Sequence, residues 1–139
     1  MTNEKSRFRR AENGTAAVEF GLLVPLLVIM LMGAIEFGLI FFAQVSAENA
    51  ARDVARRLST NRLTTSNAST VAINQLPTWI KSSATVSVTQ STPSVPATNL
   101  FVVTISVPAK AAAITGFLSW SYAGKILTSK VTQQQEPTP

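Results

Sequence analysis

The residues best suited to chemistry lie where a basic N-terminal segment meets a long apolar run. They form the stretch GTAAVEF, in which Gly14 is followed five residues later by Glu19 and then by Phe20. Glycine has no side chain, so it leaves an unhindered peptide bond that a protease can take in an extended, non-helical form. Cleavage after Gly14 would give Thr15 a new amine and would remove a leader with four basic and two acidic residues. This spacing between a basic leader and an apolar run therefore indicates a processing site, and the alternative is that Gly14 only marks the start of the helix.

Glu19 is a carboxylate in the first turns of the apolar helix that follows this junction. An unpaired charge at that depth in lipid costs about 2–4 kcal/mol or is protonated instead, so Glu19 is expected to have a partner. The new amine of Thr15 on a neighbouring subunit would neutralise the carboxylate, and this amine exists only after cleavage. A second interpretation places Glu19 at the inner headgroup level, where lipid and water satisfy it without a protein partner.

The composition excludes several other kinds of chemistry. The chain has no cysteine and no histidine, which excludes disulfides, thiolate and imidazole catalysis and the commonest zinc ligands. Asp53 is the only aspartate, and no nucleophile–base arrangement stands out, so no enzyme, cofactor, metal or small-molecule substrate is expected. The net charge of +5 comes largely from residues that flank the apolar run without interleaved aromatic side chains. Nucleic acid is therefore not an expected partner.

The apolar run, residues 20–43, has the length of a membrane helix. Its 24 residues exceed the roughly 20 that cross the hydrocarbon core, and Glu36 is its sole charged residue. Pro25 removes one backbone donor, which predicts a kink that neighbouring helices tolerate. Glu36 follows Glu19 by about 25 Å along a helix, so it either meets water at the outer interface or contacts another subunit in a helix bundle.

Beyond residue 43 the sequence becomes amphipathic, so the helix is expected to continue into water and to end near residues 59–62. Its polar face carries a basic cluster, Arg52, Arg56 and Arg57. We interpret this cluster as a solvated face, with attraction to acidic headgroups or an acidic partner as the alternative. Four basic residues stand on each side of the apolar run, so the positive-inside rule alone does not orient the helix.

The C-terminal part predicts a small sheet. Three segments alternate apolar with polar residues, as strands with one buried face do: residues 84–91, 100–110 and 125–134. The segments between them are expected to be a loop at residues 60–70, a short helix at 71–80 and a helix or packed loop at 111–124. The predicted fold is α+β: a leader at 1–14, a transmembrane and amphipathic helix at 15–62, and a small antiparallel, β-rich extracytoplasmic domain at 63–139.

The N-terminal sequence also resembles a known family. The stretch RFRRAENGTAAVEFGLLVPLLVIMLMGAIEFGLIFFAQVSAENAARDVARRL, with Pro25, Glu36 and Phe37, is similar to the N-terminal region of TadE-like proteins of tight-adherence (Tad/Flp) type IV pili. The resemblance covers about the first 62 residues, and the remainder of the chain is compatible with it.

What the resemblance implies is a minor pilin or pseudopilin that assembles through its N-terminal helix. A prepilin peptidase would cut between Gly14 and Thr15 on the cytoplasmic side, and Glu19, Phe20 and Glu36 would make intersubunit contacts. The N-terminus would be cytoplasmic and the strand-rich domain periplasmic, in a bacterial inner membrane. The expected partners are the prepilin peptidase, other pilins and Tad pilus assembly proteins, and inner-membrane lipid.

Two alternatives remain open at this stage. In the first, signal peptidase cuts an exported protein after Val45-Ser46-Ala47, but the apolar region then has 24 residues with Glu36 inside, against about 7–15 in ordinary signal peptides. In the second, the helix anchors an exported interaction domain that has no connection with pili. That protein would lose no mass in the presence of a prepilin peptidase.

Overall fold

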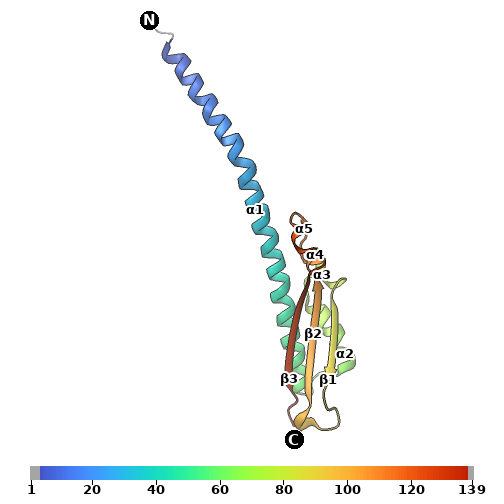
Figure 1. The fold of residues 1–139 in the computed structure, drawn as a ribbon. Helices are drawn as coiled ribbons and strands as arrows, with labels where there is room; N and C mark the ends of the chain where they lie inside the picture. Colours follow the sequence, from blue (N-terminus) through green and yellow to red (C-terminus); the bar gives the residue numbers. More distant parts are fainter. Residues whose placement is uncertain (1–3, 138–139) are drawn as a thin grey trace. The chain divides into compact units, whose positions relative to one another are not determined.

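Helix α1 (Glu4–Ser59) contains the whole apolar run (Figure 1). The computed structural model describes the backbone of residues 4–137 and the side chains of residues 15–137. From Thr15 to Ser59 the helix is long and apolar enough to cross a membrane, and it continues through Pro25. Its end at Ser59 confirms the predicted end, because serine, threonine and asparagine accumulate there.

The start of α1 differs from the predicted start at Thr15. The backbone is already helical from Glu4, so α1 runs through Gly14. The segment before Gly14 is rich in Glu, Lys, Arg and Ala, which are good helix formers, and a single glycine costs a helix only about 1 kcal/mol relative to alanine. Local propensity therefore carries the helix across the glycine at which a break was expected.

The chain divides into two compact units that join between Ile35 and Glu36. We call them the N-terminal unit (Met1–Ile35) and the C-terminal unit (Glu36–Pro139). The second part of α1 thus belongs to the same compact unit as the strands.

The C-terminal unit contains the predicted antiparallel sheet. Its three strands lie in the order β1-β2-β3, with the bounds β1 (Thr85–Gln90), β2 (Leu100–Pro108) and β3 (Ile126–Gln134). In the register, Val103 at the centre of β2 faces Val88 of β1 and Val131 of β3. Burial alternates along β2 as the sequence pattern predicts, and this confirms the α+β fold class.

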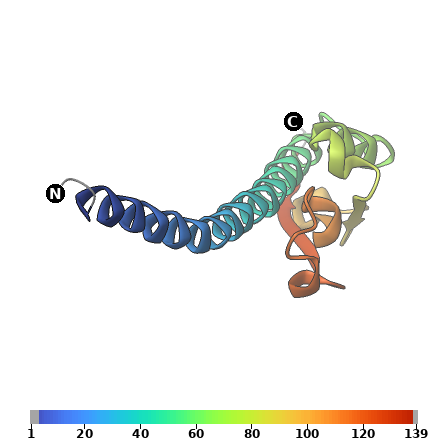
Figure 2. The same ribbon diagram turned by 90° about the horizontal axis from the view of Figure 1, so that it is seen from above.

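The inner face of the sheet packs on the second part of α1 and on α2 (Thr65–Gln75), which lie on the same side of the sheet (Figure 2). The buried side chains of α1 at this contact are mostly alanines, whose small size lets the helix backbone approach the strands closely. The largest fully buried apolar residues of the cluster are Leu58, Ile80, Ile105, Val54, Val103 and Val107.

Helix α2 corrects the loop predicted at residues 60–70, since the chain is helical from Thr65. Serine, threonine and asparagine are weak helix formers, but Ala68 and Ala72 are fully buried in the core. Tertiary packing of this face therefore outweighs propensity. Four short helices complete the unit: α3 (Thr78–Lys81), η1 (Pro96–Thr98), α4 (Ala109–Ala112) and α5 (Ser119–Tyr122).

The C-terminal segment returns to the end of α1. The Glu136 N–H donates to the Ser59 carbonyl oxygen at 2.8 Å, and the Gln135 side-chain amide donates to Asn61 Oδ1 at 2.6 Å. Asn61 has a left-handed φ of 57°, which asparagine tolerates better than most residues and which reverses the chain after α1. These contacts fix the end of the sheet to the end of the helix.

Candidate functional site

The apolar side chains of the N-terminal unit are exposed on every face of α1. Each residue from Leu26 to Met32 is exposed, and seven successive residues take in all faces of a helix with 3.6 residues per turn. A helix that is apolar all round is stable in lipid or in a bundle of helices rather than in water. This part of α1 therefore requires a lipid or protein environment that the single chain does not supply.

The residues predicted at the processing site lie along the start of this exposed helix. Glu19 and Phe20 are both exposed, and Phe20 presents 70% of its surface. Thr15 and Glu19 are four residues apart and so lie on one face of α1. Among the residues whose side chains are described, no hydrogen bond or ion pair engages the Glu19 carboxylate.

Glu36 is in a different situation, because it is fully buried within the C-terminal unit. Its Oε2 accepts the Leu118 N–H at 2.7 Å, and its Oε1 accepts the Tyr122 hydroxyl. The Thr115 side chain and the Gly116 backbone also lie near the same carboxylate. The carboxylate is thus met by two donors from one segment, residues 118–122, and no buried side-chain polar atom of the described residues lacks a partner.

The segment that surrounds Glu36 is shaped by a turn and by a small apolar cluster. Gly116 has a φ of 64°, a left-handed conformation that residues with a Cβ rarely adopt, and the turn lies just before the Leu118 N–H that donates to the carboxylate. Tyr122 is buried with Ala109 and Ala113, and Ile40 of α1 packs against them. Burial raises the pKa of Tyr122 to about 12, and the hydrogen bond to Glu36 and the charge of Glu36 act in the same direction.

This arrangement gives Glu36 a third possibility besides the two that the sequence suggested. The hydrogen-bond donors that the structure gives to Glu36 lie in its own chain. The roles of Leu118 and Tyr122 are not evident from the sequence, because residues 111–124 have no clear period and a backbone N–H leaves no trace in a sequence. The one available signal was Tyr122, the single tyrosine, in an otherwise apolar segment.

The basic cluster forms local ion pairs. Arg52 pairs with Glu48, and Arg57 Nε lies 2.8 Å from Asp53 Oδ2, each pair one helical turn apart. Gln75 of α2 donates to the same Asp53 oxygen at 2.6 Å. Burial raises the pKa of Asp53, but these hydrogen bonds and the nearby arginine charges outweigh it and lower the pKa below its usual value.

Beside these pairs lies a surface pocket of about 440 Å³ at the end of α1, lined by Asp53, Arg56, Arg57, Thr60 and Arg62. Its lining is formed by the C-terminal turns of α1 and the residues that follow. Two of the three clustered arginines thus have acidic partners on their own helix, as on a solvated face.

Comparison with known proteins identifies the N-terminal region. Residues 14–56 match the family model described as TadE-like protein. The matched segment contains Gly14, Glu19, Phe20 and Glu36, and it extends through the part of α1 that packs on the sheet. No match to the chain was found among curated proteins or among solved structures.

Proposed function

We propose, from the TadE-like domain that residues 14–56 form, that this chain is a minor pilin or pseudopilin of a Tad-type pilus. The family match is the observation that carries the proposal. The helix supports it, because its N-terminal part exposes apolar side chains on all faces and so suits either a bilayer or a bundle of neighbouring pilin helices. One stretch of chain can then serve in the membrane before assembly and in the filament afterwards.

In this proposal a prepilin peptidase cuts between Gly14 and Thr15. Gly14 lies within helical backbone, so the peptidase must first unwind the local turn. Glycine favours this step, because it is about 1 kcal/mol weaker than alanine as a helix former. The cut removes the charged leader and with it a cytoplasmic anchor that resists withdrawal of the helix from the bilayer.

Processing also supplies a partner for Glu19. The amine of Thr15 on a neighbouring subunit neutralises the exposed carboxylate, and Phe20 packs beside this contact. An acid–amine pair away from water has a strict geometry, so it sets the axial register between helices. The predicted assembly contact thus depends on the predicted cleavage.

In this proposal the protein has a structural role and is not an enzyme. It lies in the bacterial inner membrane as a single-pass protein with a cytoplasmic N-terminus and a periplasmic C-terminal unit. Its partners are the prepilin peptidase, other pilins, Tad assembly proteins and inner-membrane lipid. No cofactor, small-molecule substrate or nucleic acid takes part in this role.

The test replaces Glu19 and counts pili by electron microscopy in cells that express the full chain. Glu19→Ala is expected to lower piliation strongly, because the subunit loses the partner of the Thr15 amine. Glu48→Ala is the matched control, since Glu48 is a partly exposed acid on the same helix that pairs with Arg52 outside the apolar run. Wild-type piliation with Glu19→Ala would leave the assembly role of this residue without support.

The same cells provide a second measurement, the N-terminal sequence of the mature protein. Cleavage as proposed gives a chain that starts at Thr15. An intact N-terminus on protein from cells with normal fibres would instead favour a membrane-anchored protein with an exported interaction domain, unrelated to pilus assembly.

A further inference from the structure

The two tryptophans of the C-terminal unit lie near the same stretch of α1. Trp79 in α3 stacks on Phe42 of α1, with ring centroids 5.9 Å apart and an angle of 25° between the ring planes. Trp120 in α5 lies between Leu118 and Tyr122, and both of these residues donate hydrogen bonds to Glu36. The tryptophans are therefore attached to α1 at residues 42 and 36, about 9 Å apart along the helix axis.

These attachment points lie at the outer end of the apolar run. With a rise of about 1.5 Å per residue, a hydrocarbon core of about 30 Å that begins near Phe20 ends near residue 40. Glu36 and Phe42 thus lie on either side of the expected boundary between hydrocarbon and headgroups. Tryptophan is enriched at this depth in membrane proteins, because its ring is apolar and its N–H is polar.

The segment that carries Trp120 exposes an unusual amount of apolar surface. Trp120 is 79% exposed, Ile114 60% and Phe117 43%. On α1 beside this level, Phe37 and Phe41 are 68% and 63% exposed. Exposed large apolar side chains that gather in one part of a unit favour a binding surface.

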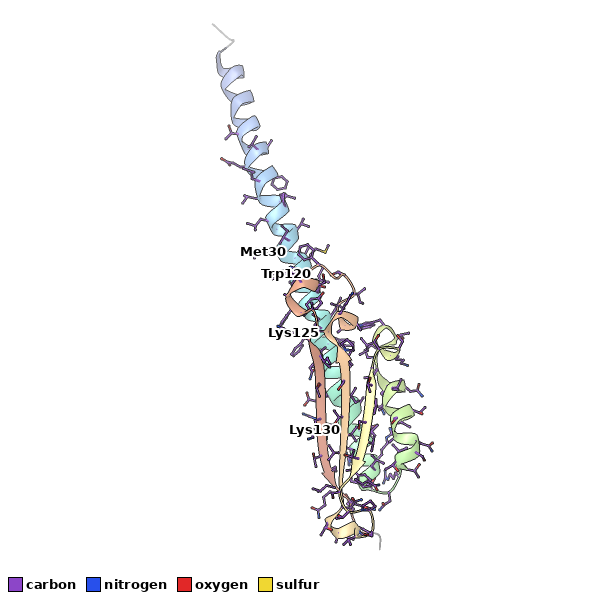
Figure 3. The ribbon with its side chains drawn as sticks, turned by 45° about the vertical axis from the view of Figure 1, so that its right-hand side comes forward. Met30, Trp120, Lys125 and Lys130 are labelled. Carbon is purple, nitrogen blue, oxygen red and sulfur yellow. The ribbon has the colours of Figure 1, made fainter. Side chains whose placement is uncertain are left out.

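The charges around this patch favour anionic lipid. Exposed Lys110 precedes the segment and exposed Lys125 follows it, and the sequence has no acidic residue between Asp53 and Glu136. Figure 3 shows Trp120 and Lys125 at the same end of the sheet, with Lys130 further along β3. Lysines at a membrane surface are attracted to anionic headgroups.

We propose that residues 113–124 are an interfacial membrane anchor, in which Ile114, Phe117 and Trp120 insert among the lipid headgroups around α1 and Lys110 and Lys125 contact anionic headgroups. Glu36 is the positioning residue of this anchor, because its hydrogen bonds hold the segment at the level of the boundary. The inference rests on the membrane insertion of α1 in the proposed function, and it adds a second contact between the C-terminal unit and the lipid surface.

The test uses the purified full chain in vesicles of phosphatidylcholine and phosphatidylglycerol. The variant Trp79→Phe leaves Trp120 as the only tryptophan, and Trp120→Phe is the matched control that leaves Trp79. Fluorescence is measured with lipids brominated at shallow or deep positions of the acyl chain and with aqueous acrylamide. Trp120 is expected to emit at shorter wavelength than a water-exposed indole, to be quenched most by shallow bromines and to be protected from acrylamide.

The outcomes separate this inference from the proposed function. If the chain floats with the vesicles but Trp120 is quenched by acrylamide as in water and not by brominated lipid, the anchor is refuted while membrane insertion stands. If Trp120 is shielded from both quenchers, and the shielding weakens as the chain is diluted in lipid, a second copy covers the patch and the lipid anchor is also refuted. A chain that does not float with vesicles would refute insertion and anchor together.

Discussion

The hydrogen bond from the Tyr122 hydroxyl to Glu36 provides the sharpest test of the arrangement around the buried carboxylate. Tyr122→Phe removes one oxygen atom and leaves the aromatic ring in its cluster with Ala109 and Ala113. The Leu118 N–H at 2.7 Å still donates to the carboxylate after the change. The variant therefore isolates one donor with little change in packing.

The expected size of the effect of Tyr122→Phe follows from the negative charge of its acceptor, the Glu36 carboxylate. A hydrogen bond to a charged group shifts an equilibrium by about 10- to 150-fold, more than a bond between neutral groups does. Because Tyr122 and Leu118 bind the two oxygens of the same carboxylate, loss of one bond should favour opening of the whole segment. In Tyr122→Phe, the equilibrium constant for opening of residues 113–124 is therefore expected to increase by about 10- to 150-fold.

Hydrogen exchange measures this opening directly. The full chain in mild detergent is exchanged, digested and analysed by mass spectrometry for peptides that cover residues 113–124. Ser119→Ala is the matched control, since Ser119 lies in the same segment and is exposed, and it should leave protection unchanged. A change of less than about threefold with Tyr122→Phe would refute the conclusion that the carboxylate holds this segment.

Two further predictions concern pH. Tyr122, the only tyrosine, should titrate near pH 12 in the folded chain by phenolate absorbance, and Glu36→Gln should lower this pKa. Because the folded pKa is raised, the contribution of Tyr122 to stability is complete below the ordinary tyrosine pKa of about 10 and is lost as the pH rises toward 12. Titration of Tyr122 near pH 10 would contradict this prediction. Asp53→Asn should lower the free energy of unfolding by no more than about 1 kcal/mol at pH 7, since the Asp53 side chain is 39% exposed. Its folded pKa is lowered, so this difference should shrink as pH falls below about 4 in denaturant titrations followed by tryptophan fluorescence, and a difference unchanged at low pH would contradict the assignment.

The strands could be predicted from the sequence because one physical rule determines them. Each strand has one face on the core and one toward solvent, so apolar and polar residues must alternate. Val103 and Ile105 of β2 are fully buried while Thr104 between them is partly exposed, and this alternation is visible in the sequence. The long helix was predictable from the length of its apolar run and from the helical period of its amphipathic continuation.

The elements that depend on tertiary packing were harder to predict. α2 is built largely from residues that favour loops, and only the burial of Ala68 and Ala72 in the assembled core accounts for its helical backbone. The extent of the C-terminal unit was hidden in the same way, because the alanines of α1 that pack on the sheet also suit an isolated helix. Both the helical backbone of α2 and the extent of the C-terminal unit depend on packing between residues that are far apart in the sequence.

The Glu36 site could not be predicted, because its donors are remote in sequence. Leu118 and Tyr122 lie 82 and 86 residues from Glu36, and one of the two donor groups is a backbone N–H that any residue except proline provides. The sequence indicates only that an acid within an apolar helix needs partners. The fold determines where they come from.

Glu19, just before the apolar run, and Glu36, inside it, have different surroundings in the structure, and this difference bears on their expected roles. Glu36 receives its donors from the C-terminal unit and is fully buried there, so it has little capacity left for a neighbouring subunit. Glu19 is exposed and has no such donors among the described residues. We therefore expect intersubunit contacts to concentrate in the N-terminal unit and Glu36 to act within the chain. Loss of Glu19 should then impair assembly while the C-terminal unit stays folded, whereas loss of Glu36 should first loosen residues 113–124.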